Sequence, residues 1–228
     1  MKIALFDIDG TLLATRESGK RSMGRAMLAL LGTEGPREHR YDGKTDKQIV
    51  REALQLRGFS DADISKHMDA VIARYLVELE ADLSCPDQGA IVLPGVHALL
   101  EAVDDDKSMV LGLLTGNVEQ GATRKLRAAG IEPNQFLVHA FGSDHEVRHE
   151  LPRIARAATL LGRAVSAEAC VIIGDTPNDV ACSRPIGARA IAVATGHYSV
   201  ADLQACSPEA VFADLTDTCA VLEAIRAA

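Results

Sequence analysis

The sequence predicts an α/β protein with a parallel-sheet core and an inserted α-helical domain. Short runs that are apolar at every position recur along the chain and alternate with helical patterns. This alternation is typical of a parallel sheet that is covered by helices on both faces. After the first apolar run, a long stretch contains three helical patterns in succession without a convincing strand between them. That stretch is interpreted as the helical insert.

The expected core strands are the four fully apolar runs at residues 3–6, 109–114, 170–173 and 190–194. Helical patterns lie between these runs at residues 118–129 and 151–161, and they end at Gly130 and Gly162 respectively. Glycine directly after the last periodic residue is a common stop signal for a helix. Strands that alternate with helices in this way predict right-handed crossover connections.

The chain is expected to divide into a core of residues 1–14 and 93–228 and a helical insert of residues 15–92. The first helix of the insert should end at Gly32. The second should begin after Thr45, whose spacing to Gln48 matches a capping box, and the third should begin at Ser60. Each pattern repeats apolar residues at helical spacing, and we interpret these stripes as packing faces.

Composition narrows the possible partners. The chain has 228 residues, of which 47% are hydrophobic, so it can bury a sizeable core. The formal net charge of −8, the aromatic content of 4% and the lack of Trp argue against nucleic-acid binding. No apolar stretch approaches the roughly 20 residues of a membrane helix. We therefore expect no nucleic-acid or membrane partner and a monomer or weak homodimer.

The five cysteines are odd in number and form no CxxC pair, so neither a zinc site nor a disulfide framework is indicated. The first residues carry one lysine and a short apolar run broken by Asp7, which is not the pattern of a signal peptide. A reducing compartment fits these features best, and we expect a cytoplasmic protein.

Three of the apolar runs end in distinctive polar segments, which read DIDGT at residues 7–11, TGN at 115–117 and DTPND at 175–179. Ligands of open parallel sheets bind beyond the carboxyl ends of the strands. If these strands are neighbours, four carboxylates meet at one edge of the sheet: Asp7, Asp9, Asp175 and Asp179. Clustered carboxylates repel one another unless a cation lies among them, and such oxygen ligands suit Mg²⁺.

The residues themselves indicate how such a site would work. Asp7 would be an ionised nucleophile beside a metal that neutralises an incoming phosphate. Asp9 would act as a general acid on the leaving oxygen and then as a base for water. Gly10 would let the chain turn sharply after the strand, and Thr11 would cap the turn or contact the phosphate.

The segments DIDGT, LLTGN and GDTPND, in this order, resemble motifs one, two and four of the haloacid dehalogenase superfamily of phosphohydrolases. The insert resembles the small helical cap of that superfamily, and the core is then expected to be Rossmann-like. The resemblance extends over essentially the whole chain. It is specific because three motifs occur in order and each one closes an apolar run.

This resemblance implies a role for each matching residue. Asp7 would become an aspartyl-phosphate, and Asp9 would be the general acid and base. Thr115 and Asn117, with Gly116 between them, would hold the transferring phosphoryl group. The implied Mg²⁺ ligands are the side chains of Asp7 and Asp175 and the backbone carbonyl of Asp9, with Asp179 supporting them.

The third motif of the superfamily is a single Lys or Arg that balances charge at the phosphate. No KPxP stretch marks it in this sequence. Arg148 is the first choice for this residue, and Arg153 is the second.

The implied function is hydrolysis of a small phosphorylated metabolite, with a phosphoglycolate-like ester as the best guess. The presence of an acidic residue, Asp9, at this position argues against a dehalogenase, because displacement of halide needs no proton. A sugar phosphomutase would share every motif, and a phosphonate hydrolase would add a lysine from the insert, so both stay open. In another class, a non-catalytic phosphate-binding protein would be expected to lack Asp7 or Asp175.

Substrate specificity is expected in the insert, at residues 41–46. Gly43 would permit a close approach to the substrate, Lys44 would meet a polar group, and Thr45 would cap the helix that follows. The alternative for each of these residues is a plain turn between helices.

Overall fold

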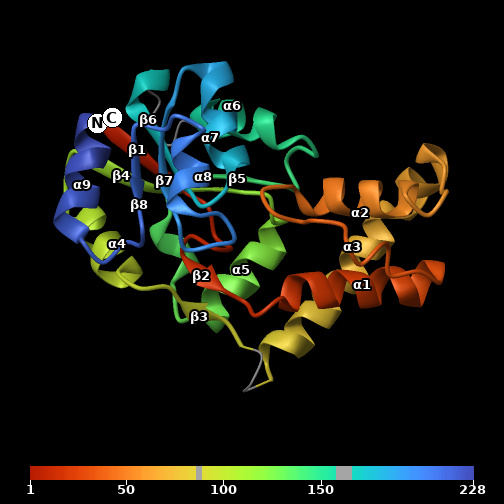
Figure 1. Cartoon of the computed structure of the whole chain (residues 1–228). Helices are drawn as coiled ribbons and strands as arrows, with labels where there is room; N and C mark the ends of the chain where they lie inside the picture. The colour runs from red at the N-terminus through yellow and green to blue at the C-terminus, as the bar shows by residue number, and fades with distance from the viewer. Residues whose placement is uncertain (86–88, 158–165) are drawn as a thin grey trace.

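The computed structural model of the chain describes residues 1–85, 89–157 and 166–228. Its centre is a sheet of six parallel strands in the order β5-β4-β1-β6-β7-β8 (Figure 1). The strands are β1 (Lys2–Phe6), β4 (Met109–Thr115), β5 (Val138–Phe141), β6 (Cys170–Gly174), β7 (Arg189–Val193) and β8 (Ala210–Phe212). The predicted α/β class is therefore confirmed.

The four predicted strands correspond to β1, β4, β6 and β7, which occupy the middle of the sheet. The two edge strands, β5 and β8, were not predicted. In β5 the exposed His139 interrupts the apolar run, and the three residues of β8 are only half-buried. A strand without a neighbour on one side does not need to be apolar at every position, so its sequence signal is weaker.

Helices cover both faces of the sheet (Figure 1). One face packs against α4 (Val96–Asp105), α5 (Glu119–Ala128) and α9 (Thr218–Ala227). The other packs against α6 (Leu151–Ala157), α7 (Pro177–Ser183) and α8 (Val200–Gln204). Within β1, Ala4 and Phe6 face the first layer, and Ile3 and Leu5 face the second. This alternation explains why the strand is apolar throughout.

The described part of the core also contains four 3₁₀ turns: η1 (Pro133–Gln135), η2 (Arg148–Glu150), η3 (Ala167–Ala169) and η4 (Arg184–Ile186). The predicted helix at 118–129 corresponds to α5. The predicted helix at 151–161 begins as α6, and its remaining residues, with Gly162, lie outside the described residues. In the described part of the chain, no helix is both long and apolar enough to cross a membrane.

The insert contains α1 (Ser18–Leu31), α2 (Asp46–Gln55) and α3 (Asp61–Leu83), where the sequence predicts three helices. An antiparallel pair, β2 (Leu13–Ala14) and β3 (Ile91–Val92), joins the two ends of the insert. Strand β3 follows α3, so in the described residues no strand lies between the three helices, as the sequence indicates. The two residues of β3 are too few to produce a strand pattern in the sequence.

The insert has a hydrophobic core of its own. Side chains from all three helices meet there, including Met27, Leu54, Ile64 and Tyr75. The apolar stripes of the sequence are therefore packing faces, as predicted. Val118, at the start of α5, is the buried residue of the sheet domain that joins this cluster.

Helix α2 begins against the core. The backbone N–H of Asp46 donates to the carbonyl of Gly116 (2.8 Å), and the N–H of Val118 donates to Asp46 Oδ2 (2.8 Å). Thr45 Oγ1 donates to the carbonyl of Glu146 (2.5 Å) and accepts from the N–H of Gln48 (3.1 Å). The predicted capping box is only half formed, because the Gln48 side chain donates to Glu52 instead.

The Asp46 carboxyl is buried in this contact. Burial raises the pKa of Asp46 from its usual 3.8 to about 6, while the nearby Lys125 opposes the shift. An ionised Asp46 at neutral pH therefore costs the folded state some of its stability.

Replacing Leu54 tests the packing of the insert. Leu54 is fully buried, so Leu54→Ala should lower the free energy of unfolding by about 3 kcal/mol in a urea titration. Leu56, two residues further on, is 64% exposed and provides the matched control. Equal losses in Leu54→Ala and Leu56→Ala would show that the insert lacks the described core.

Asp46→Asn tests the cost of the buried carboxyl. The folded state holds the Asp46 proton more tightly than the unfolded chain, so its stabilising contribution is complete below the usual pKa of 3.8 and is lost as pH rises through about 6. The asparagine retains an oxygen for Val118 but does not ionise. Between about pH 3 and about pH 7.5, the wild type should therefore lose about 3 kcal/mol more than the variant. Parallel pH profiles of urea unfolding would contradict this.

Candidate active site

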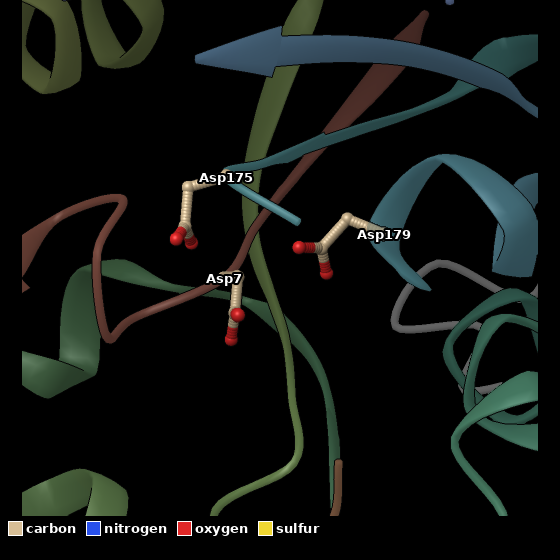
Figure 2. Close-up of side chains that lie close together, drawn as sticks. All are labelled: Asp7, Asp175 and Asp179. Carbon is tan, nitrogen blue, oxygen red and sulfur yellow. The ribbon is translucent and has the colours of Figure 1, made fainter. Parts of the chain in front are cut away.

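Three carboxylates gather at the carboxyl ends of β1 and β6 (Figure 2). Asp7 directly follows β1, Asp175 directly follows β6, and Asp179 lies in the first turn of α7. One oxygen of each lies within 4.8 Å of the others, and all three residues are buried. The N–H of Asp7 donates to the carbonyl of Ile173 (2.9 Å), which fixes the ends of the two strands together.

Arg148, in the 3₁₀ turn η2, is the cation of this cluster. Its guanidinium is buried, with Nη2 at 3.1 Å from Asp7 Oδ2 and in a hydrogen bond with Asp179 Oδ1. Although burial disfavours its charged form, the carboxylates of Asp179 and Asp7 raise the pKa of Arg148. Arg148 therefore stays charged and holds two of the three carboxylates.

One guanidinium does not balance three buried carboxylates. Burial raises the pKa of Asp7 to about 6, although Arg148 opposes this. Burial also raises the pKa of Asp175 well above its usual range, and the charges of Asp179 and Asp7 add to the shift. A group of buried oxygen ligands with excess negative charge fits a small divalent cation such as Mg²⁺.

The three carboxylates differ in what already holds them. Asp179 Oδ2 accepts from the N–H (3.0 Å) and the hydroxyl (2.6 Å) of Thr176, while its other oxygen accepts from Arg148. Thr11 Oγ1 donates to Asp175 Oδ1 (3.0 Å). Asp7 and Asp175 line a cavity between the core and the insert, which is described below. Asp179 is thus occupied by its neighbours, whereas Asp7 and Asp175 face the space where a ligand would bind.

Gly10 makes room for Asp175. Its φ of +80° lies in the left-handed region, and a Cβ at this position would lie 2.3 Å from Asp175 Oδ2. Both the turn after β1 and the packing of the carboxylate therefore require glycine.

The carboxylate of Asp9 belongs to a separate group of hydrogen bonds. Its Oδ2 accepts from Lys125 Nζ (2.7 Å) and from Asn117 Nδ2 (2.8 Å). Lys125 Nζ also donates to Asn117 Oδ1 (2.6 Å), and Asn117 Nδ2 also donates to Thr115 Oγ1 (2.9 Å). The side chain of Asp9 is therefore held on the side of Thr115 and Asn117, outside the acidic cluster.

A cavity of about 740 Å³ lies between the core and the insert. Asp7, Asp9, Asp175, Thr115, Asn117 and Arg148 line it from the core, and Gly10 and Gly116 lie at its wall. Arg16, Lys20, Tyr41, Gly43 and Lys44 line it from the insert. The structure thus brings residues of the three recognised motifs to one space, together with Arg148.

Arg148, the first choice for the third motif, lies at the carboxylates. Arg153, the second choice, is exposed and forms its ion pair with Glu150 (3.5 Å). The geometry favours Arg148.

The expected substrate contacts of Thr11 and Thr45 need correction. Both side chains are fully buried, and neither residue is among those that line the cavity. The hydroxyl of Thr11 is committed to Asp175, and that of Thr45 to Glu146 and the start of α2. Thr11 supports the acidic cluster, and Thr45 caps α2.

The Gly43–Lys44 segment lines the cavity. Gly43 has a φ of +67°, and a Cβ there would lie 2.7 Å from Thr176 Oγ1. Its carbonyl accepts from Asn178 Nδ2 (3.0 Å), so the segment packs directly on the loop after β6. Lys44 Nζ donates to Glu52 (2.5 Å) and lies 3.2 Å from His39 Nε2.

Lys125 was not identified from the sequence. It lies on the buried face of α5 together with Gly121, Ala122 and Leu126. A lysine is almost never fully buried unless it is paired. A charged residue within the apolar stripe of a predicted helix was therefore the signal that could have found it.

Comparisons with known proteins agree with this geometry. Residues 4–184 match the model of the haloacid dehalogenase-like hydrolase family. A phosphoglycolate phosphatase of Rhodospirillum rubrum is 26% identical over 217 residues, which cover 93% of this chain and 87% of the relative.

Solved structures show the same fold. A hydrolase from Pseudomonas syringae superimposes with a TM-score of 0.76 at 23% identity, covering 98% of both chains. CbbY from Rhodobacter sphaeroides, solved in complex with phosphate, has a TM-score of 0.70 at 22% identity and covers 95% of this chain and 96% of its own. With its motifs gathered at one sheet edge and a family match over most of its length, the chain belongs to the haloacid dehalogenase-like hydrolases.

Proposed function

We propose that this hydrolase cleaves small phosphate monoesters through an aspartyl-phosphate on Asp7, with a phosphoglycolate-like ester as the best guess. The observation that carries the proposal is the separation of Asp7 from Asp9. Asp7 lies among carboxylates beside Arg148, Asp9 is held by neutral and cationic donors, and both line one cavity. Such different surroundings suit a nucleophile and a proton-transfer group.

In the first step, an oxygen of Asp7 attacks phosphorus, and the bond from phosphorus to the ester oxygen breaks. Asp9 gives its proton to that leaving oxygen. In the second step, Asp9 takes a proton from water, which attacks phosphorus and releases inorganic phosphate and free Asp7. Thr115 and Asn117 would hold the phosphoryl group during both steps, and Arg148 would offset its charge.

The donor set of the acidic cluster supports Mg²⁺ as the cofactor. Asp7, Asp175 and the backbone carbonyl of Asp9 would hold the ion. Asp179, which accepts hydrogen bonds from Thr176 and Arg148, would support these ligands. Bound there, Mg²⁺ would neutralise charge on the phosphoryl oxygens.

The cavity supports a small phosphorylated metabolite as the substrate. At about 740 Å³, it lies within the usual range of about 300–1,000 Å³ for small-molecule sites. The relative from Rhodospirillum rubrum is a phosphoglycolate phosphatase, and CbbY was solved with phosphate. We place specificity at Gly43 and Lys44, because the core residues contact only the parts that all phosphate esters share.

Asp7→Asn should abolish phosphate release, because the amide cannot serve as the nucleophile, whereas Asp9→Asn should slow it by about 10²–10⁴-fold. Phosphate release from a panel of phosphorylated metabolites measures both effects, and intact mass spectrometry should detect phosphorylated protein in Asp9→Asn but not in Asp7→Asn. Asp69→Asn, on the exposed side of α3, is the matched control. Turnover by Asp7→Asn would refute the mechanism.

Chelation should abolish turnover, and added Mg²⁺ should restore it. Ca²⁺ should support turnover poorly, since its larger and looser coordination misplaces the phosphoryl group for attack. Equal rates with Mg²⁺, with Ca²⁺ and without metal would argue against the metal site. Formation of an isomeric sugar phosphate instead of inorganic phosphate would identify a phosphomutase.

A further inference from the structure

Among the described residues of the core, Lys125 carries a buried ammonium that none of the motifs explains. We propose that Lys125 is a positioning residue, which orients Asp9 so that one chosen oxygen of its carboxyl carries the transferred proton. The inference rests on the proposed function and adds to it a residue outside the four motifs.

The hydrogen bonds distinguish the two oxygens of Asp9. Oδ2 accepts from the Lys125 ammonium (2.7 Å) and from the Asn117 amide (2.8 Å). Oδ1 has a single long contact, from Thr15 Oγ1 (3.5 Å). An oxygen that already accepts two hydrogen bonds, one of them charge-assisted, is the unfavourable place for a proton. The proton exchanged with the substrate is therefore carried on Oδ1.

The contacts of Lys125 also fix the residue beside Asp9. Because Nζ donates to Asn117 Oδ1 (2.6 Å), the amide of Asn117 must direct its nitrogen toward Asp9 and Thr115. One ammonium thus sets the orientation of both the proton-transfer group and a proposed phosphoryl ligand. Neither a methionine nor a leucine at this position would do so.

The insert closes over this ammonium. A Cβ on Gly19 of α1 would lie 3.4 Å from Lys125 Nζ, so α1 packs beside the ammonium. Asp46 is the second carboxylate that faces Lys125. Lys125 itself is only 4% exposed. The ammonium is thus shielded, while the side chain of Asp9 stays 39% exposed at the cavity, where a substrate can reach it.

A purely structural role makes a different prediction. If Lys125 only offsets the charges of Asp9 and Asp46, its loss should lower stability and slow every substrate to the same extent. If it orients Asp9, its loss should matter most where the leaving oxygen most needs a proton. The pKa of the leaving group therefore separates the two roles.

The test compares para-nitrophenyl, phenyl and para-methylphenyl phosphate, which are similar in size and differ in leaving-group pKa. Lys125→Met should lower kcat/KM by about 10²-fold for para-methylphenyl phosphate and far less for para-nitrophenyl phosphate. The value of kcat/KM is chosen because it reports the step in which the ester bond breaks. Lys125→Gln, which keeps an N–H donor, should recover part of the loss. Arg127→Met, at an exposed position of the same helix, should match the wild type.

A double-mutant cycle with Asp9→Asn completes the test. Once Asp9 cannot transfer a proton, Lys125→Met should cause little further loss, whereas independent roles would give multiplicative losses. Equal losses for all three esters, or multiplicative losses in the cycle, would overturn the role of Lys125 and leave the proposed function standing. A wild-type protein that releases no phosphate from any ester would overturn both. If Lys125→Met does not fold, the same comparisons made with Lys125→Gln decide the question.

Discussion

The crowding of Asp7, Asp175 and Asp179 is the constraint on which the rest of the site depends. Three carboxylates within 4.8 Å of one another, all buried, repel each other and have lost most of their water. The surrounding residues supply partial compensation: Arg148 contacts two of the carboxylates, Thr176 contacts one, and Thr11 contacts the third. The negative charge that stays unbalanced is what makes the cluster suited to a metal and a phosphoryl group.

The separation of Asp7 and Asp9 follows from the end of β1. In a continuing strand, two residues at this spacing would point to the same face. Here the chain turns, and the carbonyl of Ile8 accepts the N–H groups of Leu12 (2.9 Å) and Leu13 (3.1 Å). Asp9 is thereby directed toward Asn117, away from Asp175. Because of this turn, Asp7 lies among other carboxylates, whereas Asp9 lies beside the hydrogen-bond donors Lys125 and Asn117.

Sequence patterns predicted those features that depend on periodicity or on strand ends. Central strands covered on both faces are apolar throughout, and polar residues at their carboxyl ends must meet because the strands are parallel. The edge strands β5 and β8 were not predicted, because each has a neighbouring strand on one side only and need not be apolar at every position. The contacts of Lys125 were not predicted, because 116 residues separate this lysine from Asp9 in the sequence. The same limit applies to Thr11, whose distant partner Asp175 replaced the expected phosphate.

The start of α2 shows why the insert is best regarded as part of the active site. Gly43 packs on Thr176 and Asn178 at the start of α7, while Asp46 bonds to Gly116 and Val118 in the loop after β4. The first segment bears two of the three clustered carboxylates, Asp175 and Asp179, and the second bears the proposed phosphoryl ligands. A displacement of α2 would therefore disturb both halves of the chemistry together. If the Gly43–Lys44 segment selects the substrate, as we propose, it does so in direct contact with the segments that bear the proposed catalytic residues.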